Sequence, residues 1–153
     1  MSLKDWLKNG WLAEHKTSPQ EIADLFGIAA RDLKNCHAPG LSADWQLNIA
    51  YNAALQMATA ALAASGYRAV REAHHYRTIQ SLAHTIDADQ TTVIQLDLFR
   101  KKRNMSDYER AGAVSDQEAK EMESLAKKLR KDVEDWQREK HPELFLTPKG
   151  GSD

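Results

Sequence analysis

Several features that mark out large classes of proteins are scarce or absent in this sequence. A single cysteine, Cys36, excludes an internal disulfide and is typical of a protein of the reducing cytoplasm. Charged residues at positions 4, 5 and 8 interrupt the start of the chain, which therefore lacks the apolar core of a signal peptide. We find no strand-like alternation, no glycine-rich phosphate loop, no nucleophile elbow and no zinc-ligand spacing. We therefore expect a cytoplasmic protein without a metal or cofactor.

Charge of one sign is also not in excess. The 21 Lys and Arg side chains are balanced by 22 Asp and Glu, which leaves a formal net charge of −1. The chain as a whole therefore offers no electrostatic attraction for nucleic acid or for an acidic partner. Any such attraction must come from a local cluster of charges.

The stretch from Ala43 to Gly66, ADWQLNIAYNAALQMATAALAASG, predicts the helix around which the rest of the chain is arranged. Its apolar residues recur at helical spacing on two opposite sides, so several neighbours must bury this helix. We expect the core to centre on Tyr51, Leu55 and Leu62. The following polar residues interrupt the stretch too often for a membrane span: Gln46, Asn48, Asn52, Gln56 and Thr59.

Start and stop signals divide the remaining chain into four or five further helices. Ser2, Ser18 and Ser115 each stand three residues before an acidic residue, as in a capping box, and residues 87–90 can cap a helix that runs towards Arg110. We expect one all-α domain, a single bundle of five or six helices with a long central helix over residues 18–140. A helical arm over residues 1–17 precedes it, and a disordered tail over residues 141–153 follows.

The most informative stretch is VIQLDLFRKKRNMSDYER, residues 93–110. At about 100° per residue, one polar stripe of this helix holds Arg100, Arg103, Asn104 and Asp107, with Tyr108 at its edge. A basic helix end of this kind is commonly solvated surface that favours the helix dipole. The alternative is a site for phosphate or for an RNA backbone, which arginine side chains bind well.

The same helix is apolar on two sides. We expect Ile94, Leu98 and Met105 to face the core of the bundle, which leaves Val93 and Leu96 on the side of the arginine stripe. A symmetric homodimer would cover this pair and bring two arginine stripes together at a shared site. Alternatively, the N-terminal helix with its two tryptophans folds over the pair within one chain.

The order of these elements and three local strings resemble the HEPN superfamily of small helical domains. The strings are IAYNAALQMATAAL, GYRAVREAHHYRTIQSL and RKKRNMSDYER, and the likeness covers residues 18–138. Many members of this family are endoribonucleases of toxin–antitoxin and defence systems, and others are non-catalytic partners of small nucleotidyltransferases. The resemblance implies an RNA- or nucleotide-associated helical domain, with an antitoxin or a nucleotidyltransferase as its candidate partner.

The ribonuclease motif of that family is an arginine, usually followed by a polar residue, with a histidine a few residues further on. Arg103 and Asn104 match its first part, but Tyr108 stands where the histidine is expected, and residues 85–140 contain no histidine. Tyrosine, with a pKa of about 10, is a poor proton shuttle at neutral pH. The resemblance therefore implies a site that binds without cutting, and the candidates for a catalytic role are Arg103, Tyr108 and His75.

The adjacent His74 and His75 allow three interpretations. The first is metal binding, which the spacing argues against, because neighbouring side chains on a helix point about 100° apart and do not chelate a metal together. His84 lies too far along the chain to complete one face. The imidazoles can instead cap backbone groups or pack beside Tyr76. In the third interpretation, one of the pair crosses space and supplies the missing proton shuttle near Arg103.

Together these patterns and the resemblance predict a cytoplasmic, homodimeric, HEPN-like bundle that does not contact a membrane. It would bind RNA or a nucleotide-linked partner through Arg100, Arg103, Asn104, Asp107 and Tyr108. Two alternatives stay open. One is an atypical metal-independent endoribonuclease that uses the same stripe with a histidine of the 74–75 pair, and the other is a purely structural bundle in which the basic stripe is incidental.

Overall fold

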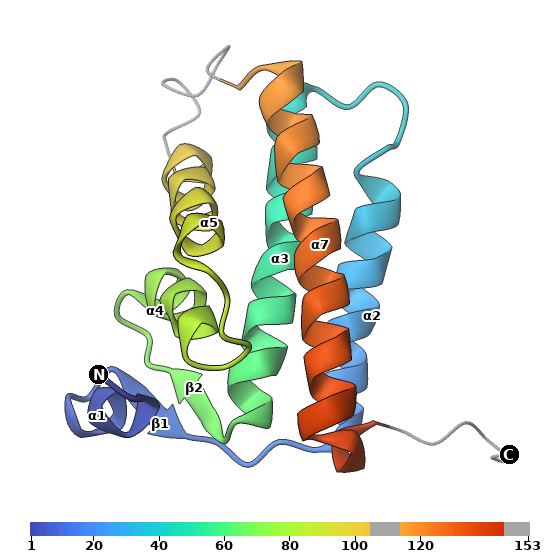
Figure 1. Ribbon diagram of the computed structural model, residues 1–153. Helices are drawn as coiled ribbons and strands as arrows, with labels where there is room; N and C mark the ends of the chain where they lie inside the picture. Colours follow the sequence, from blue (N-terminus) through green and yellow to red (C-terminus); the bar gives the residue numbers. More distant parts are fainter. Residues whose placement is uncertain (105–113, 146–153) are drawn as a thin grey trace, which may run out of the picture.

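The computed structural model describes residues 1–104 and 114–145 (Figure 1). Within these residues the protein is an all-α bundle of six α-helices with one small sheet, which confirms the predicted fold class. The elements are α1 (Leu3–Lys8), β1 (Leu12–Glu14), α2 (Pro19–Asn35), α3 (Ala43–Ala64), β2 (Tyr67–Ala69), α4 (His74–Gln80), α5 (Gln90–Arg103) and α7 (Asp116–Lys140), with short 3-10 turns η1 (Ser81–Ala83) and η2 (Pro142–Leu144). None of the described helices is both long and apolar enough to cross a membrane.

The central helix predicted from the sequence is α3. Helices α2 and α7 run alongside it, and α4 and α5 cover a further side (Figure 1). Twelve of its 22 residues are buried, and most of these are alanines, which let the neighbouring helices approach closely. Tyr51 and Leu55 lie in the main core as expected, whereas Leu62 belongs to a smaller cluster at the sheet end of the helix.

Local sequence signals fix most helix ends. Ser2 and Ser115 each form a full capping box with the acidic residue three positions later. Asp89 caps α5 by accepting a hydrogen bond of 2.8 Å from the backbone N–H of Thr92. Ser18 caps α2 with its side chain, and Pro19 follows at the first helical position, where the absence of its N–H costs nothing.

The sequence pattern did not predict the antiparallel pair of β1 and β2, in which Leu12 stands opposite Ala69. Each strand has three residues, too few to display an alternating pattern. Gly66 adopts a positive φ of 99°, which ends α3 and turns the chain directly into β2. The predicted N-terminal arm thereby packs onto the bundle, where Trp6 and Leu12 are buried with Leu62.

Helix α5 turns the opposite apolar side inward from the one we predicted. Val93 and Leu96 are buried in the main core, whereas Ile94 and Leu98 are 50% and 58% exposed. The prediction that Ile94 and Leu98 fill the core is therefore wrong, and so is the expectation that Val93 and Leu96 need a second subunit or the N-terminal helix to cover them. Met105 lies outside the described residues. Both sides of α5 are similarly apolar, so hydrophobic periodicity alone could not choose between them.

The first residues of the predicted disordered tail are ordered. The chain turns through η2, and the ring of Phe145 lies 5.9 Å from that of Phe26 on α2. The guanidinium carbon of Arg138 lies 4.6 Å from the centre of the same Phe145 ring. Aromatic and cation–π contacts therefore hold residues 142–145 against the bundle. Residues 146–153 lie outside the described part of the chain.

Candidate functional site

A cluster of basic and aromatic side chains forms where the C-terminal end of α5 meets the start of α4 and the middle of α3. The guanidinium carbon of Arg103 lies 5.3 Å from the centre of the Tyr51 ring, and that ring lies 6.2 Å from the ring of His75. The guanidinium carbon of Arg100 lies 5.4 Å from the centre of the Tyr76 ring. We call these five residues the α4–α5 cluster.

The packing of α5 explains why the two arginines point towards the bundle. Arg100 and Arg103 share a side of the helix with Val93 and Leu96, as the sequence predicted, and the structure shows that this side faces inward. Both arginines are consequently half-buried. The simplest interpretation of the sequence was a fully solvated helix end. The structure shows instead that the two arginines of the basic stripe are partly buried.

The start of α4 is set by an unusual backbone conformation. Ala73 adopts a positive φ of 55°, which costs an alanine about 1 kcal/mol. The helix then begins with His74 and His75, whose ring centres lie 5.9 Å apart. His75 is the one that turns towards Tyr51, while His74 stays exposed.

Four basic side chains gather in the last turn of α5. Arg100 donates from Nε to Asp97 at 2.7 Å, and the Nζ of Lys101 lies 3.5 Å from the other oxygen of the same carboxylate. Lys102 pairs with Glu118 of α7. The last turn of α5 therefore has four cations, Arg100, Lys101, Lys102 and Arg103, and the described carboxylates of Asp97 and Glu118 pair with three of them. A local gathering of cations of this kind can attract an anion although the whole chain is nearly neutral.

Burial and the nearby cations set the protonation states of the cluster. Burial lowers the pKa of His75, and the positive charges of Arg103 and His74 lower it further. Burial raises the pKa of Tyr51 to about 12, although Arg103 and Arg100 act in the opposite direction. At neutral pH, His75 is therefore a neutral imidazole that can accept a proton, and Tyr51 keeps its hydroxyl hydrogen.

An open pocket of about 480 Å³ lies beside the cluster, lined by Ala73, His74, His75, Tyr76, Arg100 and Asn104. Guanidinium, carboxamide and imidazole groups supply hydrogen-bond donors, and the Tyr76 ring supplies a flat apolar surface. This combination of groups suits a phosphate group attached to an aromatic base.

The structure brings together some of the predicted site residues and not others. Arg100, Arg103 and Asn104 lie at one helix end, and His75 reaches that end across space, as the third interpretation of the histidine pair required. Asp107 and Tyr108 lie outside the described residues. His84 has a different role, since its ring packs 5.1 Å from the Trp6 ring.

Sequence reasoning missed the two tyrosines of the cluster. Tyr51 was expected to be core, which it is, but its buried hydroxyl also borders the arginines. One signal for Tyr51 was available in the sequence. A tyrosine in an alanine-rich helix that is expected to be buried places a hydroxyl in the core, and a buried hydroxyl normally needs a hydrogen-bond partner. Tyr76 is adjacent in sequence to His75, but nothing in that string indicated that Arg100 would lie over its ring.

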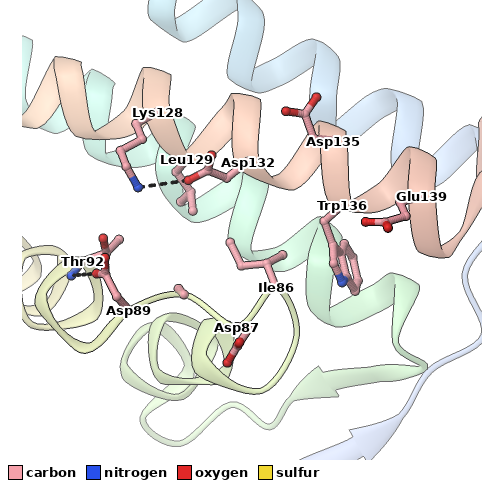
Figure 2. Close-up of a pocket in the computed structure, with 11 residues that line it drawn as sticks. Ile86, Asp87, Asp89, Thr92, Lys128, Leu129, Asp132, Asp135, Trp136 and Glu139 are labelled. Carbon is pink, nitrogen blue, oxygen red and sulfur yellow. Dashed lines mark hydrogen bonds and ion pairs between the residues drawn. The ribbon is translucent and has the colours of Figure 1, made fainter.

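A second pocket, of about 410 Å³, has the opposite charge (Figure 2). It lies between the start of α5 and α7, with Trp136 at its wall. Its one ammonium group, on Lys128, is bound to Asp132 at 3.0 Å. The carboxylates around it belong to Asp87, Asp89, Asp132, Asp135 and Glu139. This pocket repels phosphate, so the two pockets do not compete for the same ligand.

The geometry of the α4–α5 cluster and the resemblance in sequence are the two observations from which we infer a function. No family model matches the chain, and no curated protein or solved structure is significantly similar to it.

Proposed function

We propose that the protein binds RNA through its phosphate groups at the α4–α5 cluster, as the binding module of an HEPN-like domain. The observation that carries this proposal is the inward rotation of α5, which places Arg100 in the lining of an open pocket and Arg103 over the ring of Tyr51. Guanidinium groups bind phosphate oxygens through paired, charge-assisted hydrogen bonds. The exposed ring of Tyr76 offers a surface on which an unpaired base can stack.

The energetic expectation follows from the type of contact. A hydrogen bond between charged groups contributes about 1.5–3 kcal/mol, so losing one arginine weakens binding by about 10- to 100-fold. Binding to phosphate also releases counterions, so the affinity falls as salt rises.

Fluorescence anisotropy with a labelled single-stranded RNA tests the proposal. Arg100→Ala and Arg103→Ala should each weaken binding by at least about tenfold and flatten its dependence on salt. Lys131→Ala is the matched control, because it removes one positive charge from a surface ion pair on α7. If Arg103→Ala binds like the parent, the proposal fails. A free nucleotide that competes at equal molar concentration would identify a nucleotide as the ligand instead of RNA.

A second candidate function, a metal-independent endoribonuclease, is favoured by the position of His75. The neutral imidazole can accept the proton of an RNA 2′-hydroxyl, whose oxygen then attacks the adjacent phosphorus. The bond to the 5′-oxygen breaks as this oxygen takes a proton from water, which leaves a 2′,3′-cyclic phosphate and a 5′-hydroxyl. The arginines stabilise the charge that develops on the phosphate. Tyr51 is buried and its pKa is raised to about 12, so it keeps its proton and does not replace the missing histidine.

We expect the purified protein to bind RNA without robust cleavage, because the family's histidine is missing after Arg103. The assay uses structured and single-stranded RNA in the presence of a chelator. Cleavage by the parent that is lost in both Arg103→Ala and His75→Ala would replace the binding proposal with the ribonuclease one. Cleavage that survives both substitutions would come from a contaminant.

We also propose a homodimer. It forms through the exposed side of α5, which carries Ile94 and Leu98, and not through the side of Val93 and Leu96, which is buried within the chain. Ile94 and Leu98 stand four residues apart on the helix and are the two large apolar side chains that it leaves exposed. Pairing of two such sides across a two-fold axis would remove both from water. An antitoxin or nucleotidyltransferase partner remains a separate proposal, carried by the sequence resemblance.

A further inference from the structure

Three side chains of metal-binding type converge between the C-terminal end of α2 and α7. Cys36 caps the C-terminal end of α2, His37 follows it, and Glu123 stands opposite on α7. One ligand atom of each residue lies within 4.8 Å of the other two. The Nε2 atom of His37 lies 2.6 Å from a carboxylate oxygen of Glu123. Cys36 is only 2% exposed, and its thiol donates to the backbone carbonyl of Leu33.

We propose that Cys36, His37 and Glu123 bind a Zn²⁺ ion through Sγ, Nε2 and a carboxylate oxygen, with water in the fourth position. A thiolate and an imidazole select zinc over magnesium or calcium, which prefer oxygen ligands. Cysteine, histidine and carboxylate are all zinc ligands in proteins, and three protein ligands with one open position are typical of reactive zinc sites.

The present distances require only a small closure. In a tetrahedral site with Zn–S of about 2.3 Å and Zn–N of about 2.0 Å, the ligand atoms lie about 3–4 Å apart. The observed atoms all lie within 4.8 Å of one another, and Nε2 of His37 and the Glu123 oxygen, now 2.6 Å apart, must separate slightly to admit the ion, so the adjustments are of about an ångström. His37 can make that movement, since 56% of its side chain is exposed and no core packing holds it.

Charge at the site is consistent with a cation. Zn²⁺ binds the thiolate form of cysteine, so the thiol proton of Cys36 is released into solvent when the metal binds. Metal binding requires Nε2 of His37 without a proton, as in the neutral tautomer that keeps its hydrogen on Nδ1. The thiolate and the Glu123 carboxylate then neutralise the two charges of the ion.

Without a metal ion, the ammonium group of Lys127 lies beside the Glu123 carboxylate. Its Nζ lies 2.7 Å from the same Glu123 oxygen that contacts His37. The two residues are one helical turn apart, and the lysine side chain is half exposed, so it can swing away into water. Lys127 therefore competes with the metal for Glu123, and its removal should tighten metal binding.

Titration of the full-length, metal-free chain with Co²⁺, a spectroscopic substitute for Zn²⁺, tests the site. Cys36 is the only cysteine in the sequence, so a thiolate-to-cobalt charge-transfer absorption can arise from this position alone. We expect that absorption to saturate at one equivalent of Co²⁺ and to disappear when Zn²⁺ is added. Zn²⁺ should also raise the temperature of unfolding.

Single substitutions distinguish metal binding from a purely structural role of these side chains. Cys36→Ser should abolish the charge-transfer absorption. His37→Ala and Glu123→Gln, which change side chains outside the core, should weaken Co²⁺ binding by more than about 100-fold, because even indirect partners of a metal are worth 10- to 100-fold. Lys127→Met should strengthen it. His141→Ala is the matched control, since His141 lies 3.5 Å from Glu143 in a surface pair.

Two results would overturn the proposal. One is the absence of charge-transfer absorption in the parent at a small excess of Co²⁺. The other is a Co²⁺ affinity that is unchanged in Cys36→Ser and His37→Ala, which would move the metal to other surface histidines. RNA binding at the α4–α5 cluster is measured separately, so failure of either proposal leaves the other standing.

Discussion

Arg103 rests against Tyr51, with 5.3 Å between the guanidinium carbon and the centre of the ring. The contact joins the basic end of α5 to a fully buried residue in the middle of α3. The raised pKa of Tyr51, which burial causes, keeps the ring neutral, so the arginine meets an aromatic face and not a phenolate. The candidate site is therefore anchored directly on the core of the bundle.

Tyr51→Phe should leave stability almost unchanged. The Tyr51 hydroxyl is buried and has no hydrogen-bond partner among the described residues. Replacing such a group by an apolar one of similar shape is nearly neutral, within about 0.5 kcal/mol, whereas Tyr51→Ala should cost about 3–5 kcal/mol. Chemical denaturation measures both. A loss of about 2 kcal/mol or more in Tyr51→Phe would show that the hydroxyl has a hydrogen-bond partner.

Leu55→Ala tests the central position of α3. Leu55 is buried in the main core, so truncating it should lower the free energy of unfolding by about 2–5 kcal/mol. Trp45→Ala, at the exposed start of the same helix, is the control and should change it by less than about 0.5 kcal/mol. A loss below half a kcal/mol in Leu55→Ala would show that the assignment of the core is wrong.

Two glutamate substitutions on α5 separate folding from assembly. Leu96 is 1% exposed, so Leu96→Glu places a charge in the core and should cost several kcal/mol, about 3 or more. Leu98 is exposed, and Leu98→Glu should preserve the fold while converting the proposed dimer to a monomer. Light scattering and circular dichroism together distinguish these effects. A parent chain that is monomeric at high micromolar concentration would remove the dimer proposal.

The pKa of His75 should report on the arginines. Burial lowers it first, and the charge of Arg103 lowers it further, so Arg103→Ala should raise it towards the ordinary histidine value of about 6.5. A bound phosphate should raise it as well, since an anion stabilises the imidazolium. Titration of the His75 ring signals by NMR measures both shifts. Identical values in the parent and in Arg103→Ala would place the arginine too far away to act on this histidine.

The same lowered pKa makes stability depend on pH. Below about pH 6.5 the unfolded chain binds a proton at His75 that the folded chain resists, so acidification through this range destabilises the fold and raising the pH restores stability. His75→Gln removes the titrating group. Urea midpoints between neutral and mildly acid pH should therefore fall less steeply in this variant than in the parent.

Local signals in the sequence were enough for most of the fold. Apolar spacing identified α3, and Ser–x–x–acid patterns placed the starts of α1, α2 and α7, because these effects act within one helical turn. The Ser18 signal was only half complete, since the Glu21 carboxylate bonds to Thr17 and His15 and not back to the cap. The strands escaped detection because a three-residue pair is held by its partner and not by its own pattern.

The sequence predicted the candidate sites less completely than the fold. It placed Arg100 and Arg103 on one stripe, but which side of α5 faces inward depends on packing against α3 and α7. The approach of His75 to that stripe and of Glu123 to Cys36 are contacts between residues distant in the chain. Spacing rules detect ligands that share a helix or a loop, and neither set does.

The small alanine side chains of α3 set how closely the neighbouring helices can approach it. Ala60 and Ala63 meet Ile22 of α2, while Tyr51 of the same helix meets Arg103. Small side chains let helix axes approach to about 8 Å, and an added methyl group in such a contact forces them apart at a cost of about 1–3 kcal/mol. The substitution Ala60→Val would push on α2, the helix that Cys36 caps at its C-terminal end. We therefore expect larger side chains at Ala60 or Ala63 to disturb the packing of α2 on α3.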